Sequence, residues 1–232
     1  MGTMISNILL CTSITLMSYA VGNKVFKTYN KAWLNPLYTV TVFIICLLTL
    51  SHVQVAQYSS GTGIFSLLLG TATVSLAVPL YKHVRIIRKN FLIIFGAVMP
   101  GTLTGVISIV LLTKYLHMNK EIMLSLIPKS VTAPIALSVS QSLGGIPSLT
   151  ILFVCISAVF SLMVGPILLN FTRIRSRIAK GLALGTSAQA IGANRAFEWG
   201  EIEGVMGSIA MITSALIMSI MIPLLLQLSF IK

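Results

Sequence analysis

The stretch Leu182–Gly204, LALGTSAQAIGANRAFEWGEIEG, constrains how the rest of the chain can fold. It is as long as a membrane span, but Ser, Thr, Gln, Asn and Gly interrupt its apolar residues, and an Arg and several Glu lie in its second half. An unpaired polar group in hydrocarbon costs several kcal/mol. We therefore expect this segment to lie buried among other helices or to line a water-filled cavity.

The composition predicts an all-α integral membrane protein with a single domain over 1–232. The chain is 56% hydrophobic and 9% charged, with a mean hydropathy of +0.98, whereas soluble domains carry about 25% charged residues. Its net charge of +12 comes largely from Lys and Arg clustered between apolar runs, at 23–31, 82–89 and 173–180. This pattern is typical of membrane topology and argues against a nucleic-acid partner.

Apolar segments near the roughly 20 residues that a bilayer requires recur along the chain. They cover 5–22, 36–55, 64–81, 91–115, 122–143, 146–171, 182–204 and 205–230. Basic loops mark the cytoplasmic side, and if every segment crossed, the cluster at 173–180 would lie opposite the other two. We expect the fifth segment to be broken or re-entrant around Pro128–Pro134, because proline removes a helical donor and Lys129 is costly at mid-bilayer. Seven to eight membrane segments result.

A weak repeat suggests two inverted halves, at about 1–115 and 116–232. Leu69-Gly70-Thr71-Ala72 resembles Leu184-Gly185-Thr186-Ser187, and Asn35-Pro36 resembles Ile146-Pro147. In inverted-repeat transporters, interrupted helices at matching positions form the substrate site.

Three blocks carry a family resemblance: LNPLYTVTV at 34–42, IPKSVTAPIALSVSQSLGGIPSLT at 127–150 and IAKGLALGTSAQAIGANRAFEWGEIEG at 178–204. In order and spacing they resemble the LrgB/CidB family of bacterial membrane proteins. That family is described as the partner of a small holin-like protein (LrgA/CidA) and is linked to control of murein hydrolases and lysis. A chloroplast relative carries glycolate and glycerate, and bacterial members have been tied to pyruvate movement.

The resemblance implies a multi-pass protein of the bacterial cell (plasma) membrane. Its function would be transport of small monocarboxylates such as pyruvate, lactate or glycolate by a homodimer. The alternative is an antiholin-type regulator that acts in complex with a LrgA/CidA-like partner and has no carrier activity.

The chain departs from the family at one informative position. Gln189 stands where the family usually has His, and Ala193-Asn194 stand where it has Thr-Ala. Glutamine does not titrate, so this side chain cannot carry a proton, but its amide can hydrogen-bond a carboxylate.

A carboxylate that leaves water needs compensating donors, which half-helix N-termini, hydroxyls and cations supply. We expect Lys129, Ser130 and Thr132 to bind the anion, because Lys129 and Arg195 are the cations within the interrupted segments. The full predicted substrate-binding set is Lys129, Ser130, Thr132, Pro134, Gly185, Thr186, Ser187, Gln189, Asn194 and Arg195.

Structural roles are the alternative for several of these residues. Lys129 could snorkel to an interface, Arg195 could form an i,i+3 pair with Glu198, and the small residues could permit close helix packing. We expect Glu201 and Glu203 to be solvated loop charges. The cysteines Cys11, Cys46 and Cys155 lie in apolar runs and are expected to be small core residues.

Neither an enzyme nor a cofactor site is predicted. The chain has no Asp, no phosphate-binding loop and no nucleophile arrangement, and its three His show no metal-ligand pattern.

Overall fold

The computed structural model describes residues 2–29, 34, 36–51, 53–75 and 77–227 of the chain, and all of its regular structure within them is helical. The fold class is therefore all-α, as predicted. The chain divides into two compact units, Met1–Ala72 and Thr73–Lys232. Asn35 and the expected end of the last span at 230 lie outside the described residues.

The first unit contains α1 (Gly2–Tyr29), α2 (Pro36–Leu50), α3 (Val55–Gly61) and most of α4 (Gly63–Ser75). Helices α1 and α2 approach closely at Gly22, where an added Cβ would lie 2.6 Å from Val40. Cys11 is buried against Gly61 as expected, whereas Cys46 is exposed and Cys155 is half-buried, so the core prediction was wrong for Cys46.

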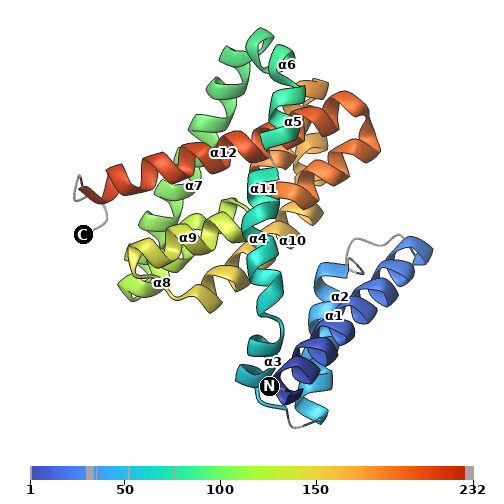
Figure 1. Ribbon diagram of the computed structural model, residues 1–232. Coiled ribbons are helices and arrows are strands. Elements are labelled where there is room, and N and C mark those ends of the chain that lie inside the picture. The colour runs from blue at the N-terminus through green and yellow to red at the C-terminus, as the bar shows by residue number, and fades with distance from the viewer. Residues whose placement is uncertain (1, 30–33, 35, 52, 76, 228–232) are drawn as a thin grey trace. The chain divides into compact units, whose positions relative to one another are not determined.

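The second unit contains the remaining helices (Figure 1). They are α5 (Ala77–Lys82), α6 (Val84–Lys89), α7 (Phe91–Tyr115), α8 (Lys120–Leu126), the 3-10 turn η2 (Ile127–Ser130), α9 (Ala133–Leu143), α10 (Pro147–Phe171), α11 (Arg177–Trp199) and α12 (Glu201–Gln227).

Four helices in the described residues are long and apolar enough to cross a membrane: Asn7–Tyr29, Phe91–Tyr115, Pro147–Phe171 and Glu201–Ile222. The expected spans at 36–55 and 64–81 correspond to shorter helices, α2 and the pair α4 and α5. The long apolar helices identify a multi-pass membrane protein.

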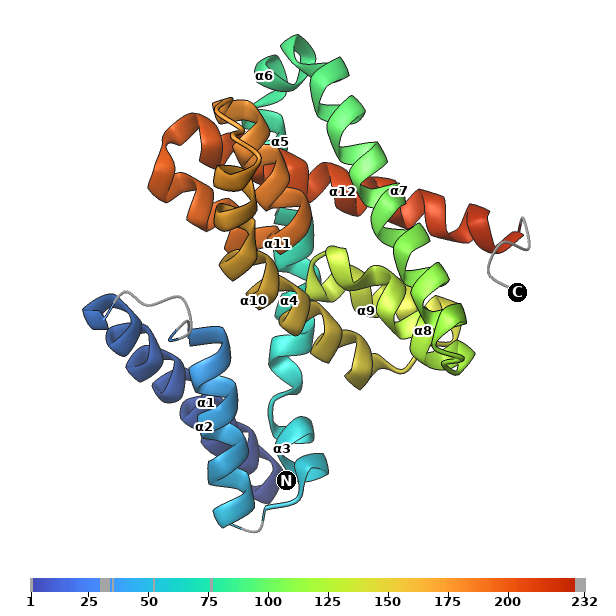
Figure 2. The ribbon, with the colours of Figure 1, turned by 180° about the vertical axis from the view of Figure 1, so that it is seen from behind.

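The predicted break at Pro128–Pro134 is confirmed. Helix α8 runs into η2, and Val131 and Thr132 are then extended (ψ 169° and 147°) before α9 begins. The end of the segment lies against α8, because the backbone N–H of Ile146 donates to Ser125 Oγ at 2.7 Å. Both views show α8 and α9 side by side (Figures 1 and 2), so the segment is a helical hairpin with η2 at its tip.

The segment Leu182–Gly204 is broken as well. Gln189 has φ 57° and ψ −137°, which separates α11 into stretches at 177–188 and 190–199. An added Cβ at Gly192 would overlap the carbonyl oxygen of Leu184. Residues eight apart in a continuous helix are about 12 Å apart along its axis, so the second stretch folds back on the first.

Candidate functional site

The second unit holds a cavity of about 580 Å³ between α7, η2, α10 and α11. Polar and small residues form much of its wall: Gly101, Thr102, Gly105, Lys129, Ser130, Ser157, Ser161, Ser176, Thr186 and Ser187. The tip of the hairpin and the first stretch of α11 therefore face one hollow, which is the environment that the sequence of 182–204 required.

The cavity runs from one end of the unit to its middle. Ile93, near the start of α7, and Ser176, which caps α11, line the cavity near that end. Gly105 and Ser157 lie in the middle turns of α7 and α10, each a helix of 25 residues. A buried apolar cluster that includes Val106, Ile127, Val131 and Ile222 packs around η2.

Among the described residues, Lys129 is the only cation on the cavity wall, and no acidic residue lines it. Within the part of the chain that the structure describes, its ammonium has no ion pair or hydrogen bond. Its neighbours on the wall include the middle turns of α7 and α10, away from the helix ends. This position favours an anion-binding role over snorkelling to an interface.

The hydroxyls on the wall fall into two classes. Thr186 Oγ1 donates to the Leu182 carbonyl at 2.7 Å and Ser187 Oγ to the Ala183 carbonyl at 2.8 Å. Ser130, Ser157 and Ser161, by contrast, have no hydrogen bond in the described chain. The hydroxyl of a helical Ser commonly bonds to the carbonyl four residues earlier. These three hydroxyls make no such bond in the described chain and are therefore free to bind a ligand.

Ser157 and Ser161 are site residues that the sequence analysis missed. Both lie in α10, whose composition is otherwise strongly apolar. Their spacing of four residues places them on one helix face, and that spacing is the signal that could have identified them.

Each break carries a buried polar oxygen without a partner. Thr132 Oγ1 and Gln189 Oε1 are the two such side-chain atoms in the described residues. Gln189 is 5% exposed, and its Nε2 donates to the carbonyl of Thr186 at 3.4 Å. The amide of Gln189 is thereby tied to a residue of the cavity wall, although Gln189 does not line the cavity.

The other predicted site residues lie outside the cavity wall. Pro134 begins α9. Asn194 is exposed, and Arg195 pairs with Glu198 three residues later, as the structural alternative predicted. At Gly185, an added Cβ would overlap the backbone of Gly207, so this glycine serves the close packing of α11 against α12.

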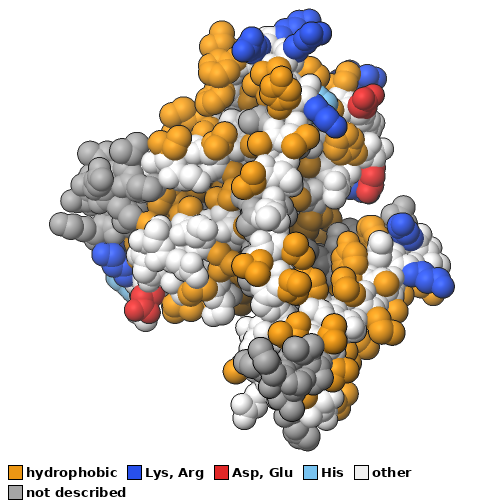
Figure 3. Space-filling model, viewed as in Figure 1, with side chains coloured by type: hydrophobic (Ala, Val, Ile, Leu, Met, Phe, Trp, Pro, Cys, Tyr) orange, Lys and Arg blue, Asp and Glu red, His pale blue; other side chains and the backbone are white. Residues whose placement is uncertain are grey.

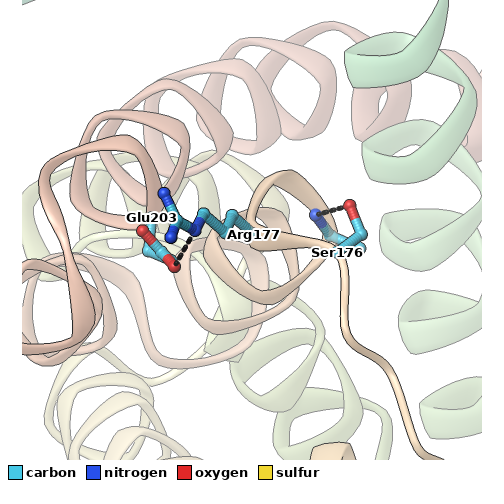
Figure 4. Close-up of polar contacts among 4 residues, drawn as sticks. Ser176, Arg177 and Glu203 are labelled. Carbon is cyan, nitrogen blue, oxygen red and sulfur yellow. Dashed lines mark hydrogen bonds and ion pairs between the residues drawn. The ribbon is translucent and has the colours of Figure 1, made fainter.

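Glu203 is not a solvated loop charge, and that prediction was wrong. It lies in the first turn of α12, is 7% exposed, and its Oε1 is 3.8 Å from Arg177 Nε (Figure 4). The contact is possible because Gly181 lets the starts of α11 and α12 approach closely: an added Cβ at Gly181 would overlap the Glu203 carbonyl oxygen. Glu201 is exposed, as expected.

These features define a multi-pass helical membrane protein with broken helices around a polar cavity. The sequence matches the LrgB-like family over residues 15–228, and the chain belongs to that family.

Several relatives resemble this chain over nearly their whole length. It is 35% identical over 214 residues to the uncharacterized protein YwbG of Bacillus subtilis (strain 168), covering 92% of this chain and 95% of the relative. It is 36% identical to YxaC of the same organism, covering 91% and 92%. It is 34% identical to the antiholin-like protein LrgB of Bacillus cereus (strain B4264), also covering 91% and 92%. No solved structure matches the chain.

Proposed function

We propose that this protein carries small organic anions of the monocarboxylate type, such as pyruvate, lactate or glycolate, across the bacterial plasma membrane. The observation that supports this most is the unpaired Lys129 at the tip of a broken hairpin, inside a cavity that no acidic residue of the described chain lines. A volume of about 580 Å³ lies within the range of small-molecule sites and accommodates such an acid with some water.

The chemistry of the wall fits a carboxylate with a neighbouring oxygen. The Lys129 ammonium offsets the negative charge, and the free hydroxyls of Ser130, Ser157 and Ser161 replace part of the lost hydration. Thr186 and Ser187 hydroxyls, whose protons are engaged by their own helix, act as acceptors for a substrate hydroxyl.

Alternating access would involve the two broken segments. In this proposal the cavity is open toward the basic loops, on the cytoplasmic side, and the apolar cluster around η2 closes the opposite side. The hairpin α8–η2–α9 is re-entrant, and the predicted halves at about 1–115 and 116–232 remain a prediction. The second unit also contains a more local pair of similar segments. Helices α7 and α10 have 25 residues each, and each is followed by a broken segment, α8–η2–α9 after α7 and α11 after α10.

Uptake into proteoliposomes tests the proposal directly. We expect Lys129→Gln to reduce saturable pyruvate, lactate and glycolate uptake by at least tenfold, because a charge-assisted bond is lost, and Lys129→Arg to retain part of it. Lys114→Gln, which removes one charge at the exposed end of α7, is the matched control. Wild-type uptake in Lys129→Gln would refute the proposed site.

The name of the Bacillus cereus relative, antiholin-like protein, favours a second candidate. In it, the protein regulates murein hydrolases through a complex with a LrgA/CidA-like holin partner and carries nothing. This candidate predicts a stable complex on co-purification and an effect on lysis that Lys129→Gln leaves unchanged. A homodimer is expected under the carrier proposal, and cross-linking in membranes distinguishes the two assemblies.

A further inference from the structure

A second cavity lies between α6 and the starts of α11 and α12. Its volume is about 520 Å³, and its wall separates into a polar and an apolar part. The polar part comprises His83, Arg85, Lys89, Asn90 and Glu201, and the apolar part comprises Ile86, Ile178, Ile202, Val205 and Met206. None of these residues lines the cavity that holds Lys129 except Ile178.

The polar part is a cationic site with free charges. Arg85 and Lys89 are four residues apart and therefore share one face of α6. In the described chain neither forms an ion pair, and both are exposed. Glu201 is the single acidic residue of the described chain on this wall, and the nearby Glu203 pairs with Arg177 instead. Figure 3 shows Lys and Arg side chains gathered over α6.

The apolar part of the wall restricts which ligands fit the cavity. Five aliphatic or Met side chains lie directly beside the cations. A soluble phosphate would use the Arg and Lys but leave this apolar surface in water, which is unfavourable in proportion to its area. A ligand with a negative headgroup and a hydrocarbon chain satisfies both parts of the wall.

The location matches a membrane surface. The cavity brings the basic cluster of 82–89 beside Ile178, within the cluster of 173–180. Two helices long and apolar enough to cross a membrane, α7 and α12, begin beside this cavity. Basic pockets between transmembrane helices on the cytoplasmic side are suited to anionic lipid headgroups.

We propose that this cavity binds the phosphate headgroup of an anionic phospholipid. Arg85 and Lys89 contact the phosphate, and the acyl chain covers Ile86, Ile202 and Val205. The bound lipid links α6 to the start of α12, beside the Arg177–Glu203 pair that joins α12 to α11. This inference does not depend on the proposed transport function.

Binding of defined lipids to the purified full-length protein in detergent tests the proposal. The probes are phosphatidylglycerol, phosphatidylcholine of the same chain length, and glycerol 3-phosphate without chains, each titrated by native mass spectrometry and by its shift of the thermal midpoint. We expect saturable binding and stabilisation with phosphatidylglycerol alone. Tight binding of glycerol 3-phosphate would overturn the lipid assignment, and equal binding of phosphatidylcholine would overturn the headgroup assignment.

A pair of double variants with equal charge change locates the site. Arg85→Gln with Lys89→Gln should weaken phosphatidylglycerol binding about thirty-fold, since each basic residue near an anionic surface contributes roughly fivefold. Lys82→Gln with Arg88→Gln removes the same charge from the same region but leaves the cavity wall intact. If the two double variants lose affinity equally, only general attraction to the basic end remains and the cavity is not the site.

Discussion

At the scale of single residues, the free hydroxyls of α10 should determine how tightly the cavity holds its ligand. Ser157 and Ser161 face the cavity without a hydrogen bond in the described chain. If they donate to a carboxylate, each bond contributes about 1.5–3 kcal/mol. We expect Ser157→Ala with Ser161→Ala to raise the KM of pyruvate uptake at least tenfold, with little change in protein stability.

Ser108→Ala is a suitable control for that experiment. Ser108 lies in α7, is exposed, and donates to the Gly105 carbonyl at 2.8 Å, so its hydroxyl is already used. Uptake by Ser108→Ala should equal that of the wild type. An unchanged KM in the α10 double variant would show that the serines are not ligands.

The sequence identified some cavity residues and missed others for a physical reason. Lys129 and Ser130, and likewise Thr186 and Ser187, lie in segments too polar for a lipid-facing helix, so composition alone marked them. Ser157 and Ser161 lie in a segment of high apolarity, which conceals two hydroxyls. Arg195 was included for its charge, but an acidic neighbour on the same helix engages it outside the cavity.

Glu203 illustrates what sequence reasoning cannot supply. Its burial depends on Gly181, which lets the two helix starts approach closely, and on Arg177 from the other helix. An acidic residue in a Gly-rich stretch after a span is typical of a solvated loop. The contact that overrides this expectation joins residues far apart in the sequence.

At the scale of helices, the contact of α11 with α12 depends on glycine. An added Cβ at Gly185 would overlap the Gly207 backbone, which cannot yield as a side chain can. We expect Gly185→Ala to lower the stability of the folded protein by about 1–3 kcal/mol, as overpacking does. The thermal midpoint in detergent measures this effect.

Gly96→Ala provides the comparison on another helix. Gly96 is exposed in α7, and nothing lies within 4 Å of a Cβ added there. Its substitution should leave the midpoint unchanged or raise it slightly, because alanine favours helix. If Gly185→Ala and Gly96→Ala had equal thermal midpoints, α11 and α12 would be able to move apart around the added methyl group without loss of stability, and the prediction would be wrong.

The two helix breaks differ in how far the sequence predicted them. Pro128 and Pro134 bracket the first break, and the loss of helical donors makes such a break predictable. The second break falls on Gln189, a non-glycine residue with positive φ. Gly185 and Gly192 were better suited to that conformation, but both are required for close backbone contacts instead.

At the scale of the whole molecule, the membrane sidedness inferred from the basic clusters stays a prediction. One cavity is lined by Arg85 and Lys89 of the cluster at 82–89 and by Ile178 from the segment 173–180, which accords with both segments lying at one end of the second unit. The division into two units and the shortness of α2 and α4 were not predicted, because apolar length alone does not show where a helix ends.

Membrane sidedness can be tested with single cysteines in a cysteine-free background in intact cells. Asn119 and Ser142 flank the hairpin and are exposed, whereas Arg175 lies in the basic loop before α11. Because α8–η2–α9 enters and returns, positions 119 and 142 should both react with a membrane-impermeant thiol reagent from outside. Position 175 should react only after the cells are permeabilised.

The outcome separates the possible arrangements of the chain. If the hairpin instead crossed the membrane fully, positions 119 and 142 would label from opposite sides. Position 142 would then behave like position 175 only if α10 failed to cross, which is incompatible with 25 residues of high apolarity. Labelling of 119 and 142 from the same side, opposite to 175, therefore requires one re-entrant segment between α7 and α10, with Lys129 near its tip.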